Sequence, residues 1–133
     1  MNKKEMRAII RAKKRAMTES QIVSASARLG EQFRECELYQ TAKTIYGYLP
    51  YNQEVRTVPM LQRALEDGKQ VAVPKVYGDT MRFILLPDLS KVAKGYSGIP
   101  EPVDDGPVAD DPHALVLMPG RAFDPQGHRL GYG

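Results

Sequence analysis

The segment from residue 119 to residue 133 carries residue types that commonly bind anions. Its glycines and arginines are Gly120, Arg121, Gly127, Arg129, Gly131 and Gly133. Glycine lets the backbone approach a ligand closely and adopt positive φ angles, and successive N–H groups in such a loop form an anion-binding concavity. Arginine adds a planar set of donors that suits phosphate or carboxylate. The segment is either a phosphate-binding loop or a surface turn with incidental arginines, because it matches no standard P-loop or dinucleotide fingerprint.

A buried strand is expected to position this loop. Residues 115–118 form a short apolar run, which is typical of a buried strand, and Pro119 and Gly120 end it. In open α/β sheets, ligands bind at the carboxyl ends of the strands. The loop therefore follows its strand at the place where a ligand is expected.

The N-terminal segment is a second candidate for anion binding. Residues 3–15 hold seven basic side chains and one acid at helical spacing, and Lys3, Arg7, Arg11 and Arg15 lie four apart on one face. The stripe is a solvated helix face, a nucleic-acid or membrane-surface helix, or a source of cations for a polyphosphate. Nucleic acid is disfavoured, because the basic residues are confined to one helix without interleaved aromatic residues.

The rest of the sequence predicts a mixed α/β fold. Thr18 and Gln21 have the spacing of a capping box, which predicts a helix that ends near Cys36. The other predicted elements are strand 44–49, helix 55–67, strand 69–74, strand 81–86, a short helical turn at 89–95, a rigid proline-bearing loop at 98–102 and strand 115–118. Strand, helix and strand in this order imply a parallel crossover, and the turn at Gly78 suggests a hairpin after it.

Composition narrows the protein class. Hydrophobic residues make up 42% of the chain and charged residues 26%, as in ordinary soluble domains. A lone cysteine, Cys36, allows neither an intramolecular disulfide nor a cysteine-based zinc site. Without a membrane-length apolar run or a signal peptide, a cytoplasmic location is expected. The acidic segment from Asp104 to Asp111 is interpreted as a solvated connector, and His113 and His128 lack ligand spacing.

Two segments resemble the signature of a known enzyme family, the 5-formyltetrahydrofolate cyclo-ligases, also called 5,10-methenyltetrahydrofolate synthetases. They are Met118-Pro119-Gly120-Arg121-Ala122-Phe123-Asp124 and Gly127-His128-Arg129-Leu130-Gly131-Tyr132-Gly133. A third segment, Gly98-Ile99-Pro100-Glu101-Pro102, also matches, and the resemblance covers all 133 residues in order. It implies a three-layer α/β/α fold with a mostly parallel sheet, similar to the ribose-5-phosphate isomerase and CoA-transferase group.

The resemblance also implies a reaction: conversion of 5-formyltetrahydrofolate to 5,10-methenyltetrahydrofolate with ATP and magnesium. The formyl oxygen attacks the γ-phosphate, and the N10 amine then attacks the formyl carbon while phosphate leaves. Such chemistry depends on positioning and charge neutralisation more than on a nucleophilic side chain. The sequence indicates no general base, so the catalytic residues stay unassigned.

Site residues follow from the same resemblance. Those expected to bind ATP are Lys3, Lys4, Arg7, Arg129, Leu130, Gly131, Tyr132 and Gly133. Those expected to bind the folate are Leu49, Glu54, Met81 and Tyr96. A carboxylate suits the pterin because it accepts hydrogen bonds from the 2-amino group and a ring N–H. The alternative for Glu54 is a cap at the start of the next helix. Lys13 and Lys14 are expected to be ordinary surface charges.

In the family, magnesium-binding aspartates and the last strands of the sheet follow the signature, and this sequence contains neither. We therefore expect residues 1–133 to form a single α/β domain that is incomplete at its C-terminus. We expect no metal site within this chain and no turnover by this chain alone. A complete protein is expected to be a monomer. The alternatives are a folate- or nucleotide-binding relative without turnover and, less favoured, a basic-helix RNA-binding module. Neither nucleic acid nor membrane is an expected partner.

Overall fold

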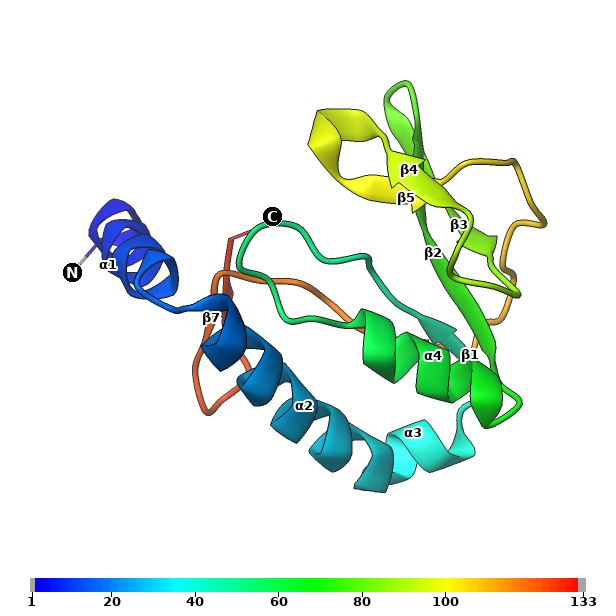
Figure 1. Cartoon of the computed structure of the whole chain (residues 1–133), viewed down its shortest axis with the longest axis horizontal. Coiled ribbons are helices and arrows are strands. Elements are labelled where there is room, and N and C mark those ends of the chain that lie inside the picture. The colour runs from blue at the N-terminus through cyan, green and yellow to red at the C-terminus, as the bar shows by residue number, and fades with distance from the viewer. Residues whose placement is uncertain (1, 132–133) are drawn as a thin grey trace.

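The computed structural model describes residues 2–131 (Figure 1). Its helices are α1 (Lys3–Arg15), α2 (Glu19–Glu35), α3 (Glu37–Thr41), α4 (Val58–Glu66) and the 3-10 helix η1 (Tyr96–Gly98). Its strands are β1 (Thr44–Tyr46), β2 (Gln70–Tyr77), β3 (Thr80–Leu85), β4 (Val92–Lys94), β5 (Pro100–Pro102), β6 (Leu115–Val116), β7 (Ala122–Phe123) and β8 (Arg129–Leu130).

The first two helices begin where their capping residues predict. Asn2 Oδ1 accepts a hydrogen bond of 2.8 Å from the Glu5 backbone N–H at the start of α1. Thr18 Oγ1 accepts from Gln21 N at 3.1 Å, and Gln21 Oε1 accepts from Thr18 N at 2.9 Å. This reciprocal pair is the predicted capping box. Both predicted helices are confirmed, although α1 buries none of its residues and lies away from the sheet (Figure 1).

The central sheet has the strand order β3-β2-β1-β6. Strand β1 is parallel to β2 and to β6, with Ile45 in register with Val71 and with Leu115. Helix α4 makes the crossover from β1 to β2, and β3 returns antiparallel to β2 across the turn at Gly78. The predicted parallel crossover and the hairpin are confirmed, and the strand predicted at residues 115–118 is present as β6, which covers only Leu115–Val116.

The core lies where α4 packs on the parallel strands. Ile45, Leu61, Val71 and Val73 are almost completely buried. Gly47 follows β1 and lies directly under α4, because a Cβ atom built there would be only 2.6 Å from Leu61 Cδ2. The chain leaving β1 must therefore be without a side chain at this point for α4 to approach the sheet.

The segment from residue 89 to residue 102 differs from its prediction. Instead of a helical turn and a proline-bearing loop, it forms the antiparallel hairpin β4–β5, with Val92 opposite Pro102 and Lys94 opposite Pro100. The prolines are tolerated because the donors come from residues beside them: Gly95 N donates to Ile99 O at 2.9 Å, and Val103 N to Lys91 O at 3.2 Å. A two-stranded ribbon has only edges, where proline is permitted.

The predicted helix 55–67 begins later, at Val58. The backbone N–H of Arg56 donates to Ser26 Oγ at 2.8 Å, and Thr57 Oγ1 donates to Tyr48 O at 2.5 Å. These bonds to distant parts of the chain hold residues 56 and 57 in the loop. Among residues 2–131, no helix is both long and apolar enough to cross a membrane.

We predict that Gly47→Ala destabilises the protein by about 1–3 kcal/mol, the usual cost of overpacking a filled core. The added methyl group would meet Leu61, whose burial leaves it little room to move. The control is Gly30→Ala within α2, where an added Cβ atom would lie 3.3 Å from its nearest neighbour, Met60 Cγ, and alanine is the better helix former. Urea unfolding followed by circular dichroism measures both, and equal stability of the two variants would contradict the proposed close approach of α4.

Candidate substrate-binding site

The loop between β1 and α4, residues 47–57, carries Glu54 and is held in place by hydrogen bonds and an ion pair of Arg56. Arg56 Nη1 donates to the backbone carbonyls of Asn52 at 2.6 Å and Glu54 at 3.0 Å. Arg56 Nη2 forms an ion pair of 2.9 Å with Glu19 Oε2 on the first turn of α2. One guanidinium group thus ties two loop carbonyls to a neighbouring helix.

A tight turn within this loop orients the Glu54 carboxylate. Asn52 adopts a left-handed conformation with φ of 52°, which asparagine tolerates better than most residues. Tyr51 N donates to Glu54 Oε1 at 2.7 Å, and Glu54 N donates to Tyr51 O at 3.1 Å. Since α4 begins only at Val58, Glu54 does not cap this helix, and the capping alternative is wrong.

Glu54 is half-buried, and its surroundings act on its pKa in opposite directions. Desolvation by burial raises the pKa of the carboxyl group above its usual range, and this effect is the largest. The Tyr51 N–H and the positive charges of Lys14 and Arg56 lower it. A carboxylate of this kind can serve as a hydrogen-bond acceptor in a partly dry site.

An apolar cavity of about 200 Å³ opens on one side of Glu54. Its lining residues are Tyr48, Leu49, Glu54, Pro74, Val76, Met81, Tyr96, Ile99, Pro100, Glu101 and Pro119. The structure therefore brings together all four residues expected at the folate: Leu49, Glu54, Met81 and Tyr96. They come from the residues after β1, the following loop, β3 and η1, so that the unpredicted β4–β5 hairpin closes one wall.

Sequence reasoning missed a second carboxylate in the apolar cavity, Glu101. Its Oε2 accepts a hydrogen bond of 3.2 Å from Val76 N. It also fills the space beside Gly95, where a Cβ atom would lie 2.1 Å from Glu101 Cδ. Residues 98–102 match the family in sequence, but only the hydrogen bond from Val76 shows that Glu101 faces β2.

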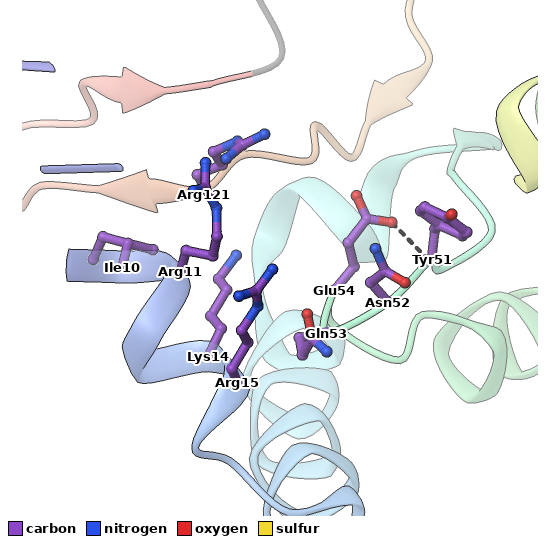
Figure 2. Close-up of a pocket in the computed structure, with 9 residues that line it drawn as sticks. All are labelled: Ile10, Arg11, Lys14, Arg15, Tyr51, Asn52, Gln53, Glu54 and Arg121. Atoms are coloured by element: carbon purple, nitrogen blue, oxygen red, sulfur yellow. Dashed lines mark hydrogen bonds between the residues drawn. The ribbon is translucent and has the colours of Figure 1, made fainter. Parts of the chain in front are cut away.

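A basic cavity of about 340 Å³ opens on the other side of Glu54 (Figure 2). Its lining residues are Ile10, Arg11, Lys14, Arg15, Tyr51, Asn52, Gln53, Glu54 and Arg121. Four of them are cations and Glu54 is the only carboxylate, so the cavity suits a polyanion. Figure 2 shows the Lys14 and Arg15 side chains extending from α1 into the space between Arg121 and the loop with Glu54.

The N-terminal residues expected at the nucleotide lie one or two turns away from this cavity. Lys3, Lys4 and Arg7 are exposed on the first half of α1 and do not line it. The second half of the same helix provides the lining instead. In particular, Lys14 is not the ordinary surface charge that the sequence suggested, because it is partly buried and lines the basic cavity. Burial lowers the pKa of its ammonium group, Glu54 raises it, and Arg121 lowers it.

Two glycines of the C-terminal segment, Gly120 and Gly131, make room for arginine side chains. Gly131 has a φ of 92°, and a Cβ atom there would be 2.7 Å from Arg121 Cγ. Gly120 lies in the same way against Arg129, whose Nη1 donates to Pro119 O at 3.0 Å. The pairing of β7 with β8, with Arg121 N donating to Leu130 O at 2.8 Å, completes this arrangement.

Arg121, rather than Arg129, Leu130 or Gly131, therefore reaches the basic cavity. The sequence signal for Arg121 was its place among the glycines, but nothing in the spacing separates it from Arg129. Two further residues expected at the nucleotide, Tyr132 and Gly133, lie outside the described residues.

The acidic connector is bound to the β2–β3 hairpin. Asp105 forms an ion pair of 3.3 Å with Lys75 and accepts a hydrogen bond from the Tyr77 hydroxyl. His128 Nδ1 lies 2.7 Å from Asp124 Oδ2 in an exposed turn. No group of three or more His, Cys, Asp or Glu side chains converges as metal ligands within residues 2–131.

Known proteins resemble the chain in sequence. A probable 5-formyltetrahydrofolate cyclo-ligase of Caenorhabditis elegans is 32% identical over 117 residues, which are 77% of this chain and 54% of the relative. A probable cyclo-ligase of Schizosaccharomyces pombe is 27% identical and is matched by 100% of this chain over 68% of its own length. The chain thus spans between about half and two thirds of these relatives.

Solved structures resemble its fold. The 5,10-methenyltetrahydrofolate synthetase of Aquifex aeolicus has a TM-score of 0.86 and 27% identity, with 100% of this chain and 68% of that one covered. A synthetase of Mycoplasma pneumoniae has a TM-score of 0.71 at 20% identity, covering 100% of this chain and 73% of its own. These likenesses and the mostly parallel sheet are consistent with the expected three-layer α/β/α fold. Because the model of the 5-formyltetrahydrofolate cyclo-ligase family matches residues 1–133, the chain belongs to that family.

Proposed function

We propose that this chain provides the folate- and ATP-binding surfaces for the conversion of 5-formyltetrahydrofolate to 5,10-methenyltetrahydrofolate. The observation that carries the proposal is that Glu54 lines both the apolar cavity and the basic cavity. A planar ring in one cavity and a polyanion in the other would meet beside this carboxylate. The reaction needs such a meeting, because the formyl group must reach the terminal phosphate of ATP.

The apolar cavity suits a reduced pterin. Leu49, Met81 and Tyr96 provide apolar and aromatic surface for a flat ring, and Glu54 provides an acceptor at its edge. A carboxylate that already accepts one backbone N–H still has lone pairs for the 2-amino group and a ring N–H of the pterin. This donor pattern gives the folate a defined orientation in the cavity.

The basic cavity suits the triphosphate of ATP. Arg11, Lys14, Arg15 and Arg121 surround a space that is large enough for phosphate groups. Lys3, Lys4 and Arg7 continue α1 beyond the cavity, and Arg129, Leu130 and Gly131 flank Arg121. We retain these residues as candidates for contacts to the parts of the nucleotide that extend out of the basic cavity.

The contribution of these residues to the reaction would be positioning and charge compensation. As the formyl oxygen attacks the γ-phosphate, negative charge spreads over the phosphoryl oxygens, and fixed cations stabilise that charge. Holding both substrates against one loop turns a reaction between two ligands into a local one. Magnesium would add further charge compensation, but residues 2–131 offer no converging carboxylates for it, and we assign it no ligand here.

Equilibrium binding to the 133-residue protein tests the proposal. Isothermal calorimetry should detect 5-formyltetrahydrofolate and ATP at separate sites, and absence of folate binding would overturn the proposal. Adding magnesium and following the absorbance of methenyltetrahydrofolate then tests turnover. Binding of both substrates without ATP-dependent product would favour the alternative of a binding relative that does not catalyse the reaction.

Glu54→Gln should weaken folate binding by about 1.5–3 kcal/mol, the range for a hydrogen bond to a charged group. The neutral amide keeps the size of the side chain but replaces one acceptor oxygen with a donor. ATP affinity should not weaken, because the substitution removes only negative charge from the basic cavity. Calorimetry with each substrate measures the two effects, and an unchanged folate affinity would refute the role of Glu54.

Folate affinity should also depend on pH through Glu54. Burial raises the pKa of this carboxyl group, so the folded protein holds its proton to a higher pH than the unfolded chain does. Affinity should therefore fall as the pH is lowered through this raised pKa, and the contribution of Glu54 to stability decreases as the pH rises through the same window. Titrations between about pH 4 and pH 7 measure this, with Glu54→Gln as the control for the titration of the folate itself.

Arg56→Lys should weaken folate binding by about 1 kcal/mol, the usual value of a lost hydrogen bond, although Arg56 does not line the apolar cavity. Lysine keeps the charge, but its single ammonium group cannot reproduce the planar set of donors that holds Asn52, Glu54 and Glu19. The matched control is Arg63→Lys, because Arg63 forms an ion pair with Asp67 at the C-terminal end of α4, away from the apolar cavity. Equal folate affinity of the two variants would show that the loop keeps its shape without Arg56.

A further inference from the structure

Two adjacent lysines on α1 have different surroundings. Lys13 is exposed, whereas Lys14 is partly buried and lines the basic cavity, where its side chain extends toward the loop that carries Glu54 (Figure 2). They have the same charge and are neighbours in the sequence, but consecutive residues of a helix point about 100° apart. Lys14 is on the side of α1 that lines the basic cavity with residues 51–54.

Lys14 and Arg56 are two cations near Glu54 that differ in their other partners. The positive charges that act on Glu54 are those of Lys14 and Arg56. Arg56 is already bound to Glu19 and to two loop carbonyls. Lys14 makes no ion pair with a carboxylate in the described part of the chain, whose ion pairs involve other residues.

The arrangement raises an electrostatic difficulty for simultaneous binding. If a folate engages Glu54 from the apolar cavity, the carboxylate must be ionised. If phosphates occupy the basic cavity, their negative charge then lies beside the same carboxylate, because Glu54 lines both cavities. The carboxylate and the phosphates are both negative, and in a partly dry site two such neighbouring charges repel each other strongly unless a cation lies between them.

We propose that Lys14 is a positioning residue that separates the Glu54 carboxylate from the terminal phosphate and so allows both substrates to bind together. This inference rests on the proposed function. The ammonium group of Lys14 would interact with two anions, the Glu54 carboxylate and the phosphoryl oxygens of the nucleotide. Arg11, Arg15 and Arg121 line the same cavity and would bind the rest of the anion.

The inference concerns the interaction between the two substrates more than the affinity of either one. In the unmodified protein, bound nucleotide should leave folate affinity unchanged or improve it. In Lys14→Ala, bound nucleotide should weaken folate binding about fivefold or more, since the two anions then face each other without an intervening cation. By reciprocity, folate should weaken nucleotide binding by the same factor.

The experiment is calorimetric titration of 5-formyltetrahydrofolate with and without the β,γ-imido analogue of ATP, which prevents turnover. The quantity compared is the ratio of the two folate dissociation constants. Lys13→Ala is the matched control and should keep the ratio of the unmodified protein. Lys14→Arg restores the charge and should return the ratio toward that value, and thermal melts of all variants report whether each is folded.

The outcomes separate this inference from the proposed function. A changed ratio in Lys14→Ala alone, restored by arginine, supports the positioning role. If the unmodified protein binds both ligands and Lys14→Ala keeps its ratio, or Lys13→Ala changes as much, the inference is overturned while the proposed function stands. If the unmodified protein binds neither ligand, both are overturned.

Discussion

The geometry of the site depends on the guanidinium group of Arg56. The loop between β1 and α4 contains one backbone-bonded turn but no helix or strand, so side chains must fix the rest of its shape. Arg56 provides this by binding the carbonyl groups of Asn52 and Glu54 while its other nitrogen pairs with Glu19 on α2. The buried hydroxyl groups of Ser26 and Thr57 fix the end of the same loop. Glu54 is therefore oriented before any ligand arrives, which reduces the ordering that binding would require.

The orientation of Glu54 has an electrostatic cost that its neighbours partly offset. A carboxylate at the border of an apolar cavity loses hydration, and this raises its pKa. The Tyr51 N–H and two nearby cations favour the ionised form again. The basic cavity has an excess of positive charge, because four cationic side chains and one carboxylate, that of Glu54, are among its described lining residues. The Glu54 carboxylate can therefore accept further hydrogen bonds from a ligand in the apolar cavity, and the cations of the basic cavity can bind a ligand with negative charge.

Much of the fold could be predicted from local patterns. The Thr18 capping box, the apolar run before Pro119 and the turn at Gly78 each depend on neighbouring residues only, and the structure agrees with all three. The β4–β5 hairpin could not be predicted, because its strands are short and its prolines suggest a loop until the pairing partner is known. Likewise, α4 begins late because Arg56 and Thr57 bond to Ser26 and Tyr48, which are distant in sequence.

The residues of the candidate site likewise include some that were predicted and some that were not. Leu49, Glu54, Met81 and Tyr96 were predicted from the family resemblance, and they line one cavity in the structure. Lys14 was not distinguished from the basic residues around it, since helical spacing gives the face of a side chain but not the element that lies opposite. Arg121 was not distinguished from Arg129, because both stand among glycines outside any helix. Glu101 and Arg56 depend on contacts between segments that no periodicity reveals.

Helix α1 provides three of the four cations of the basic cavity, yet it buries none of its residues. Its apolar side chains Met6 and Ile9 are each about two fifths exposed. Local opening requires free energy roughly in proportion to the buried contacts that are lost, so α1 belongs to the least stable part of the structure. Separation of α1 from the rest of the molecule would therefore break fewer buried contacts than opening of the sheet or of α4. The wall that α1 provides is thus the least firmly held part of the basic cavity, and a polyanion bound to its cations would hold α1 against the rest of the site.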